Sequence, residues 1–250
     1  MNTVKFDKAH VQMVAHRGLS GLEPENSIPA FIAAGNRSYF GIETDIHVTK
    51  DGNIVVIHDD DTMRVAGEAL NVEDSTYEAL RDITLKDLCR LEILNQVEKE
   101  GIKERKDLVI PNLKEYITIC KKYEKVCILE LKNPFIPKDI EKVVEAFREL
   151  GYLEQVIFIS FAVENLIGLR RLLPEQPIQY LVKSYDNSIL DIMNQYRFDL
   201  DIHYKALTKE IIDEVHENGH KVNCWTCDDK EAGERLVAWG VDFITSNILE

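Results

Sequence analysis

Apolar runs of six to eight residues, rich in β-branched side chains, recur along the chain and are separated by stretches with helical spacing. Runs of this kind predict strands that are buried on both faces. They are VQMVAH (11–16), GIETDIHV (41–48), KVCILELK (125–132), QVIFISF (155–161), IQYLVKS (178–184), DLDIHY (199–204), KVNCWT (221–226) and VDFITS (241–246). Between most of them, apolar residues lie three and four positions apart, which predicts amphipathic helices. The clearest helical stretches are LKEYITICKKY, KDIEKVVEAFREL, AVENLIGLRRLL and TKEIIDEVHENG.

The last of these stretches, residues 208–219, carries a start signal and a stop signal. Thr208 is a suitable N-cap, Glu210 places an acid in the first turn, and Gly219 follows the last apolar residue. We therefore expect a helix that begins just after Thr208 and ends before Gly219.

Eight strands that alternate with helices predict an α/β protein with a parallel sheet. In a chain of 250 residues, this number of units is typical of a TIM (β/α)8 barrel. A doubly wound open sheet is the competing architecture, but no glycine fingerprint follows the first strand. We expect residues 1–250 to form a single barrel domain.

One interval, residues 49–124, is too long for a single crossover between the second and third barrel strands. It contains an Asp-Gly turn, a polar segment over 59–83 and a charged helix-like run over 91–107. Because its apolar content is thin, we interpret it as a small insertion on the strand-ending face and not as a separate domain.

The charge balance is acidic, with 30 Lys and Arg against 44 Asp and Glu, so the net charge is −14. Nonspecific nucleic-acid binding needs a basic surface and is not expected. We expect no signal peptide ahead of the first strand, because no apolar run follows a basic start there, and no uncharged stretch approaches the ~20 apolar residues that span a bilayer. The five cysteines, an odd number, indicate reduced thiols. We therefore expect a cytoplasmic protein without stable membrane association.

Charged residues near strand ends form the candidate site. Glu43 and Asp45 are two positions apart and share a face of their strand, and so do Glu130 and Lys132. Barrel active sites form at the C-terminal ends of the strands. Carboxylates from neighbouring strands predict one hard divalent cation, Mg²⁺ or Ca²⁺, whereas zinc would more often recruit imidazole or thiolate.

The Asp51-Gly52 turn predicts that the second strand doubles back as a hairpin. Counting outward from a two-residue loop places Asp45 opposite His58. On this register the hairpin brings His58 to the carboxylates.

The first strand ends in His16 and Arg17. The Arg17 guanidinium is a planar double donor that suits phosphate oxygens. Together with His58, the cation site and Lys132, these residues form a set suited to phosphoryl transfer. One histidine would protonate the leaving oxygen, and the other would accept a proton from the attacking hydroxyl or water.

An ordered set of short motifs resembles the glycerophosphodiester phosphodiesterases, which belong to the superfamily of phosphatidylinositol-phospholipase-C-like phosphodiesterases. The match runs from about residue 12 to residue 247. Its elements are His16-Arg17-Gly18, Pro24-Glu25-Asn26-Ser27, Glu43-Thr44-Asp45, Thr49-Lys50-Asp51-Gly52, His58-Asp59, Ile110-Pro111 with Leu113 and Glu115, Glu130-Leu131-Lys132, Ser160-Phe161, Trp225-Thr226, and Gly240-Val241-Asp242 with Ile244-Thr245.

The resemblance implies a TIM barrel that hydrolyses glycerophosphodiesters to an alcohol and sn-glycerol 3-phosphate. It implies metal binding by Glu43, Asp45 and Glu130, acid-base roles for His16 and His58, and phosphate contact by Arg17, with Lys132 lining the site. It further implies an apolar wall of Phe161 and Trp225, and an insertion over about 59–108 that caps the barrel mouth.

The chain departs from the family pattern in two places. Ser27 stands where Thr is usual, and ITSNILE replaces the more common Thr-Asp-x-Pro ending. The second departure leaves open any contact from the final loop.

Several residues also have structural interpretations. Glu130 and Lys132 could form an ion pair inside the barrel, and His47 is expected to face solvent or to pack. His203 and Lys183 could touch substrate or fill the barrel. The Cys224–Cys227 spacing resembles a redox or zinc motif, but two incidental thiols are the favoured interpretation because no second pair occurs.

Competing functions are a lysophospholipase D-like activity on acylated substrates, a noncatalytic phosphodiester-binding protein and a thiol-redox role. The sequence leaves open the head group, the choice between Mg²⁺ and Ca²⁺, the oligomeric state, and whether water or the substrate's 2-hydroxyl attacks.

Overall fold

The computed structural model describes residues 2–87 and 105–250. Its sheet has the order β1-β9-β8-β7-β6-β5-β4-β2-β3, and β1 also pairs with β2. Every pairing is parallel except that of β2 with β3. The strands are β1 (Gln12–Ala15), β2 (Gly41–Val48), β3 (Ile54–Val56), β4 (Val126–Leu131), β5 (Val156–Ser160), β6 (Ile178–Val182), β7 (Asp199–His203), β8 (Val222–Trp225) and β9 (Phe243–Ser246).

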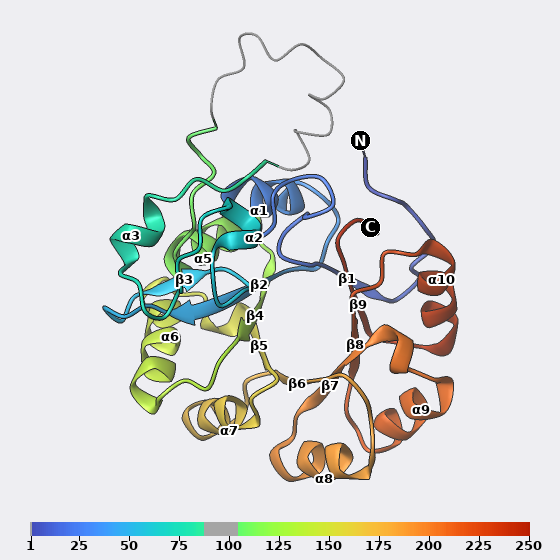
Figure 1. Cartoon of the computed structure of the whole chain (residues 1–250). Helices are drawn as coiled ribbons and strands as arrows, with labels where there is room; N and C mark the ends of the chain where they lie inside the picture. The colour runs from blue at the N-terminus through green and yellow to red at the C-terminus, as the bar shows by residue number, and fades with distance from the viewer. Residues whose placement is uncertain (1, 88–104) are drawn as a thin grey trace.

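All strands except β3 close into the predicted TIM barrel, and each of the eight predicted runs contains one barrel strand. Figure 1 shows the barrel strands as an inner ring with most of the helices around the outside. The helices are α1 (Ile28–Gly35), α2 (Met63–Ala66), α3 (Tyr77–Arg81), α5 (Leu113–Lys122), α6 (Pro137–Glu149), α7 (Val163–Leu172), α8 (Asn187–Tyr196), α9 (Lys209–Glu217) and α10 (Lys230–Trp239), with short 3-10 turns η1 (Leu153–Gln155) and η2 (Tyr204–Ala206).

The helix boundaries follow the capping signals. Helix α9 begins after Thr208, whose hydroxyl accepts a hydrogen bond from the Ile211 amide, and Gly219 follows its end with φ +82°. Both expected ends of this helix are confirmed. Helix α5 begins with a complete capping box, in which Asn112 and Glu115 each accept a bond from the other's backbone amide.

Buried apolar side chains form three groups: one outside the barrel strands, one inside the barrel and one at the hairpin. The largest cluster fills the space between the strands and the outer helices. A smaller group on the inward-facing positions includes Ile128, Ile157, Ile159 and Leu181. The third group joins the hairpin to the described parts of the insertion: Val55, Ile57, Val72, Leu80, Leu85, Leu108 and Ile110.

The insertion therefore has a small apolar core of its own, although its sequence is mostly polar. Figure 1 shows its helices α2 and α3 beside the β2–β3 hairpin. Residues 88–104 of the predicted segment 59–108 lie outside the described residues. The single-domain organisation stays a prediction. Within 2–87 and 105–250, no helix is both long enough and apolar enough to cross a membrane.

The register of the β2–β3 hairpin differs from the prediction by one residue. His47 pairs with Val55, and the Ile57 amide donates to the Asp45 carbonyl at 3.1 Å, so Asp45 faces Ile57 and not His58. The loop has three residues because Thr49 closes it: the Thr49 and Asn53 backbones are bonded, and the Thr49 hydroxyl accepts from the Asn53 amide at 2.9 Å. Three-residue loops commonly end in a left-handed residue, here Gly52 at φ +76°.

Candidate active site

A small pocket of about 90 Å³ brings together most of the predicted site residues. It lies at the C-terminal ends of the barrel strands. Its lining is His16, Arg17, Glu43, His58, Glu130, Ile159, Phe161, Leu181, Asp201, Trp225, Thr226 and Thr245. Asp45 and Lys132 are joined to this set by ion pairs with Arg17 and Glu130. His58 thus reaches the pocket although the hairpin register was wrong.

The three predicted carboxylates form one buried cluster. Each of Glu43, Asp45 and Glu130 offers an oxygen within 4.8 Å of the others, and their exposed fractions are 3%, 1% and 6%. Adjacent strands cause this proximity, because Asp45 of β2 is in register with Glu130 of β4. Lys132 Nζ lies 2.9 Å from Glu130 and 3.4 Å from Asp45, so the predicted Glu130–Lys132 ion pair is part of the same site.

The electrostatics of the cluster favour a bound cation. Burial, with the Asp45 charge adding to it, raises the pKa of Glu130 to about 8. Burial and the other two carboxylates also raise the pKa of Glu43. Burial would raise the pKa of Asp45 as well, but Arg17 and Lys132 hold it well below its usual range. Three carboxylates at this spacing are not all ionised without a further positive charge, and their oxygens suit a hard divalent ion.

Arg17 bridges the carboxylates to the loop that follows β1. Its backbone amide donates to Glu43 at 2.7 Å, and its side chain donates to Glu25 at 2.8 Å and lies 3.5 Å from Asp45. The backbone turns sharply at this point, with φ +54° at Arg17 and φ +74° at Gly18. The guanidinium lies between Glu25 of this loop and Asp45 of β2, and its contact with phosphate stays a prediction.

His16 is held by the last loop of the barrel. Its Nδ1 lies 2.8 Å from the side-chain oxygen of Asn247, which also accepts from Ser20 at 2.7 Å. The Asn247 side-chain nitrogen donates to Asp228 at 2.6 Å, and this bond fixes the orientation of the amide. Since an amide oxygen only accepts, His16 Nδ1 carries the proton and Nε2 keeps its lone pair. Burial, reinforced by Arg17, lowers the pKa of His16 to about 4.

His58 has an anionic partner instead. Its Nδ1 lies 2.7 Å from a carboxylate oxygen of Asp59. Arg64 of α2 donates to Asp59 at 2.6 Å and to Glu25 at 2.6 Å, so the insertion holds this carboxylate in place. Burial lowers the pKa of His58, and the charge of Asp45 partly offsets this effect. The two histidines therefore face one pocket with different partners, one neutral and one charged.

Aromatic rings form one wall of the pocket. Phe161 and Trp225 meet edge to face with ring centroids 5.6 Å apart, as the family resemblance implied. The His203 ring meets Trp225 in the same way at 5.2 Å, and His203 is not among the residues that line the pocket. Lys183 is exposed and is not among the residues that line the pocket.

His47 and the free cysteines Cys224 and Cys227 have structural surroundings. His47 is fully buried, with Nδ1 3.2 Å from Glu73 and Nε2 3.3 Å from the His58 carbonyl, so it packs and does not face solvent. Cys224 and Cys227 are both buried. Burial raises the pKa of Cys227 to about 11 and that of Cys224 well above its usual value, which disfavours a reactive thiolate.

Sequence reasoning did not single out several residues of this region: Glu25 and Asn26 as partners of Arg17 and Asp45, Asp201 in the pocket, and Asp228 with Asn247 behind His16. Asp201 carried a usable signal, because a charged residue inside a buried strand needs a partner or a function. Asn247 and Asp228 are exposed-looking loop residues in the sequence, and no local pattern distinguishes them.

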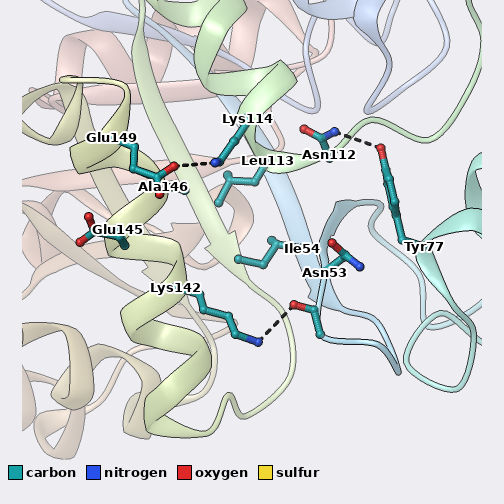
Figure 2. A pocket seen from close by; sticks show the side chains of 11 residues that line it. Asn53, Ile54, Tyr77, Asn112, Leu113, Lys114, Lys142, Glu145, Ala146 and Glu149 are labelled. Carbon is teal, nitrogen blue, oxygen red and sulfur yellow. Dashed lines mark hydrogen bonds and ion pairs between the residues drawn. The ribbon is translucent and has the colours of Figure 1, made fainter.

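A larger hollow of about 440 Å³ lies elsewhere, between the hairpin loop and helices α5 and α6. Figure 2 shows that several of its polar side chains bond to neighbouring groups. Lys114 contacts Glu149, Lys142 donates to the Gly52 carbonyl, and Asn112 donates to Tyr77. None of the predicted site residues lines it, so we place the active site at the smaller pocket.

Comparison with known proteins identifies similar chains along almost the whole length. The model of the glycerophosphoryl diester phosphodiesterase family matches residues 16–249. A glycerophosphodiester phosphodiesterase of Caldanaerobacter subterraneus subsp. tengcongensis is 30% identical over 94% of this chain and 93% of its own. One from Bacillus subtilis is 28% identical over 94% of this chain and 82% of its own.

Solved structures share the fold. A phosphodiesterase of Oleispira antarctica, in complex with its product sn-glycerol-3-phosphate, has a TM-score of 0.83 at 24% identity, covering 95% of this chain and 93% of that one. A glycerophosphodiester phosphodiesterase of Parabacteroides distasonis has a TM-score of 0.77 at 26% identity, with the same coverage.

Proposed function

The chain belongs to the glycerophosphoryl diester phosphodiesterase family, and we propose that it hydrolyses glycerophosphodiesters to an alcohol and sn-glycerol 3-phosphate with one divalent cation, Mg²⁺ or Ca²⁺. One observation carries the proposal: two histidines with different Nδ1 partners face the same pocket as a buried three-carboxylate cluster and Arg17. This combination supplies proton donors and acceptors beside a site for a phosphate.

The residues present fit a cation. Glu43, Asp45 and Glu130 would hold it through oxygen ligands. Glu130 Oε1 makes no hydrogen bond among the described residues, and its contact there is the 2.9 Å ion pair with Lys132. A bound divalent ion supplies Lewis-acid stabilisation of negative charge on the phosphate oxygens.

The local charge explains how an acidic protein accepts an anionic substrate. Ionised, the three carboxylates and Glu25, the partner of Arg17, carry −4, and Arg17 and Lys132 return +2, which leaves −2. A divalent cation would bring this group to neutrality and so remove the repulsion of a phosphodiester, although the chain as a whole carries −14.

The partners of the two histidines support different roles. His16 accepts the proton of the attacking hydroxyl, because Asn247 occupies its Nδ1 and leaves Nε2 unprotonated. His58 donates a proton to the leaving alcohol oxygen, because the Asp59 carboxylate stabilises its imidazolium form. Arg17 binds the phosphate and orients it between them. The attacking hydroxyl belongs to water or to the substrate's own 2-position.

The test is release of sn-glycerol 3-phosphate from glycerophosphocholine and glycerophosphoethanolamine. The protein is assayed with excess chelator and again after Mg²⁺ or Ca²⁺ is restored. We expect release only with the cation and loss of release in Glu43→Gln. Full activity of Glu43→Gln, or release that chelator leaves untouched, would contradict the proposal.

The same assay distinguishes the alternative functions. Release of choline from lysophosphatidylcholine, without release from glycerophosphocholine, would indicate a lysophospholipase D-like enzyme. Tight binding of glycerophosphocholine without turnover would indicate a binding protein.

A further inference from the structure

Four residues that line the pocket have a buried polar atom without a hydrogen-bond partner among the described residues. Arg17 Nε and Glu130 Oε1 lie in ion pairs with Asp45 and Lys132, whereas Asp201 Oδ1 and Trp225 Nε1 have no such contact. Both residues line the pocket, and they lie on neighbouring strands, β7 and β8. Asp201 is only 2% exposed. Unsatisfied groups of this kind are rare in protein interiors because each costs about 1–3 kcal/mol.

Polar side chains on nearby barrel strands show how buried donors and acceptors are ordinarily satisfied. Asn223, which is in register with Asp201, donates to Gln179 at 3.0 Å and accepts from Thr245 at 3.2 Å. These three buried side chains bond to one another across β6, β8 and β9. Asn223 also contacts the Asp201 carboxyl group, but Asp201 Oδ1 has no hydrogen-bond partner among the described residues. This oxygen can therefore accept a hydrogen bond from a molecule in the pocket.

The walls around the pair limit what that molecule can be. Ile159, Leu181 and Phe161 line the same pocket, and its volume is only about 90 Å³. The indole N–H donates, and the carboxyl group accepts in either protonation state. A small group with hydroxyls satisfies both atoms, whereas a quaternary ammonium has no hydrogen to donate and no lone pair to accept the indole hydrogen.

We propose that Asp201 and the Trp225 indole form the subsite for the glycerol hydroxyls of the substrate, and that Asp201 determines specificity for a polyol over an alkyl group. The proposal rests on the function proposed above. It states that the glycerol side of the diester enters the pocket. Trp225 then acts as a hydrogen-bond donor as well as part of the apolar wall. The alcohol that leaves lies toward the open side, where Phe161 is 38% exposed.

The experiment compares two ligands that differ only in the hydroxyls, sn-glycerol 3-phosphate and n-propyl phosphate. Their dissociation constants are measured by calorimetry on the protein loaded with Mg²⁺ or Ca²⁺. We expect the wild type to prefer the glycerol ligand by about 10-fold or more. In Asp201→Leu this preference falls to about 1, and binding of n-propyl phosphate changes by less than about 2-fold.

Two further variants serve as a second probe of the subsite and as a control. Trp225→Phe keeps an aromatic ring and removes only the indole N–H, so it should lower the preference several-fold even where Asp201→Leu folds poorly. Asp199→Asn is the matched control, because Asp199 lies on the same strand but bonds to the Lys221 amide and is not among the residues that line the pocket. It should leave the preference unchanged.

Equal binding of the two ligands by the wild type would overturn the subsite. So would a loss in Asp201→Leu that is the same for both ligands. Failure of the folded, cation-loaded wild type to bind either ligand would overturn the proposed function, and the subsite with it.

Discussion

The side-chain oxygen of Asn247 and Nδ1 of His16 are 2.8 Å apart, although 231 residues separate them in the chain. Asp228 fixes the amide from the other side through a 2.6 Å bond. The three residues form a chain from the loop after β8, through the loop after β9, to the end of β1. This relay sets which nitrogen of His16 carries the proton.

Loss of the Asn247 amide should lower activity through the proton-transfer step. In Asn247→Leu, His16 loses its only side-chain acceptor at Nδ1 among the described residues. We expect kcat/KM to fall by about 10²-fold with the fold intact. The tautomer is read from long-range ¹⁵N–¹H NMR spectra of the imidazole, which should show mixed Nδ1-H and Nε2-H forms. Wild-type spectra in this variant would contradict the role of Asn247.

A charge swap tests the same relay without breaking it. The double variant Asp228→Asn with Asn247→Asp keeps the bond between the two side chains with its direction reversed, and it moves the negative charge next to His16. The pKa of His16, now about 4, should rise. Because His16 acts as a neutral base, activity is lost as pH falls through this pKa. The acid limb of the kcat/KM profile should therefore move to higher pH, and an unmoved limb would contradict the base assignment.

Cation binding should release protons near neutral pH. The pKa of Glu130 is raised to about 8, and that of Glu43 is also raised, so the metal-free cluster holds a proton at pH 7. A cation displaces it, because the ligands must be ionised. Calorimetry in buffers of different ionisation enthalpy should give about one proton released at pH 7 and fewer at pH 9. A proton count that does not change with pH would contradict the assignment.

The Glu130 carboxyl group should make the metal-free protein less stable as pH rises. The folded pKa of Glu130, about 8, exceeds the unfolded value near 4.5. Its stabilising contribution is therefore complete below about pH 4.5 and is lost as pH rises toward 8. Urea unfolding of the metal-free protein should show this decline between pH 5 and pH 8. Glu130→Gln has no such titration, so its free energy of unfolding should change less with pH. Equal slopes in the two proteins would contradict the role of Glu130 in this decline.

Two glycines with the same backbone angle should differ in their tolerance of alanine. Gly18 and Gly52 have φ +74° and φ +76°, so an added Cβ costs each about 1 kcal/mol of stability. At Gly18 the Cβ would also lie 2.7 Å from backbone and side-chain atoms of Ala30, whereas at Gly52 it meets only the end of Lys142. Gly18→Ala should lose about 1–3 kcal/mol more than Gly52→Ala in the free energy of unfolding. Similar losses would show that the loop after β1 can move.

Sequence periodicity alone determined the barrel and much of the site. The strand runs and their helices were predictable because burial on both faces leaves a continuous apolar pattern in the chain itself. Glu43 and Asp45 share a face because strand side chains alternate, and Glu130 joins them because the ends of parallel strands meet at one edge. These relationships depend on local geometry and strand order. The catalytic roles, suggested by the chemistry of the residues and implied by the family resemblance, remain predictions.

Tertiary structure decided the rest. Backbone bonds of Thr49, together with its hydroxyl, close the hairpin as a three-residue loop, where the Asp-Gly pair predicted a two-residue loop. The partners of His16 depended on where the final loop lies. Asp201 Oδ1 has no partner among the described residues because the polar side chains near it bond to one another. Periodicity specifies which way a side chain faces, but not which distant polar atom lies within 3 Å of it. That distance is set only when the barrel closes and brings both ends of the chain to one pocket.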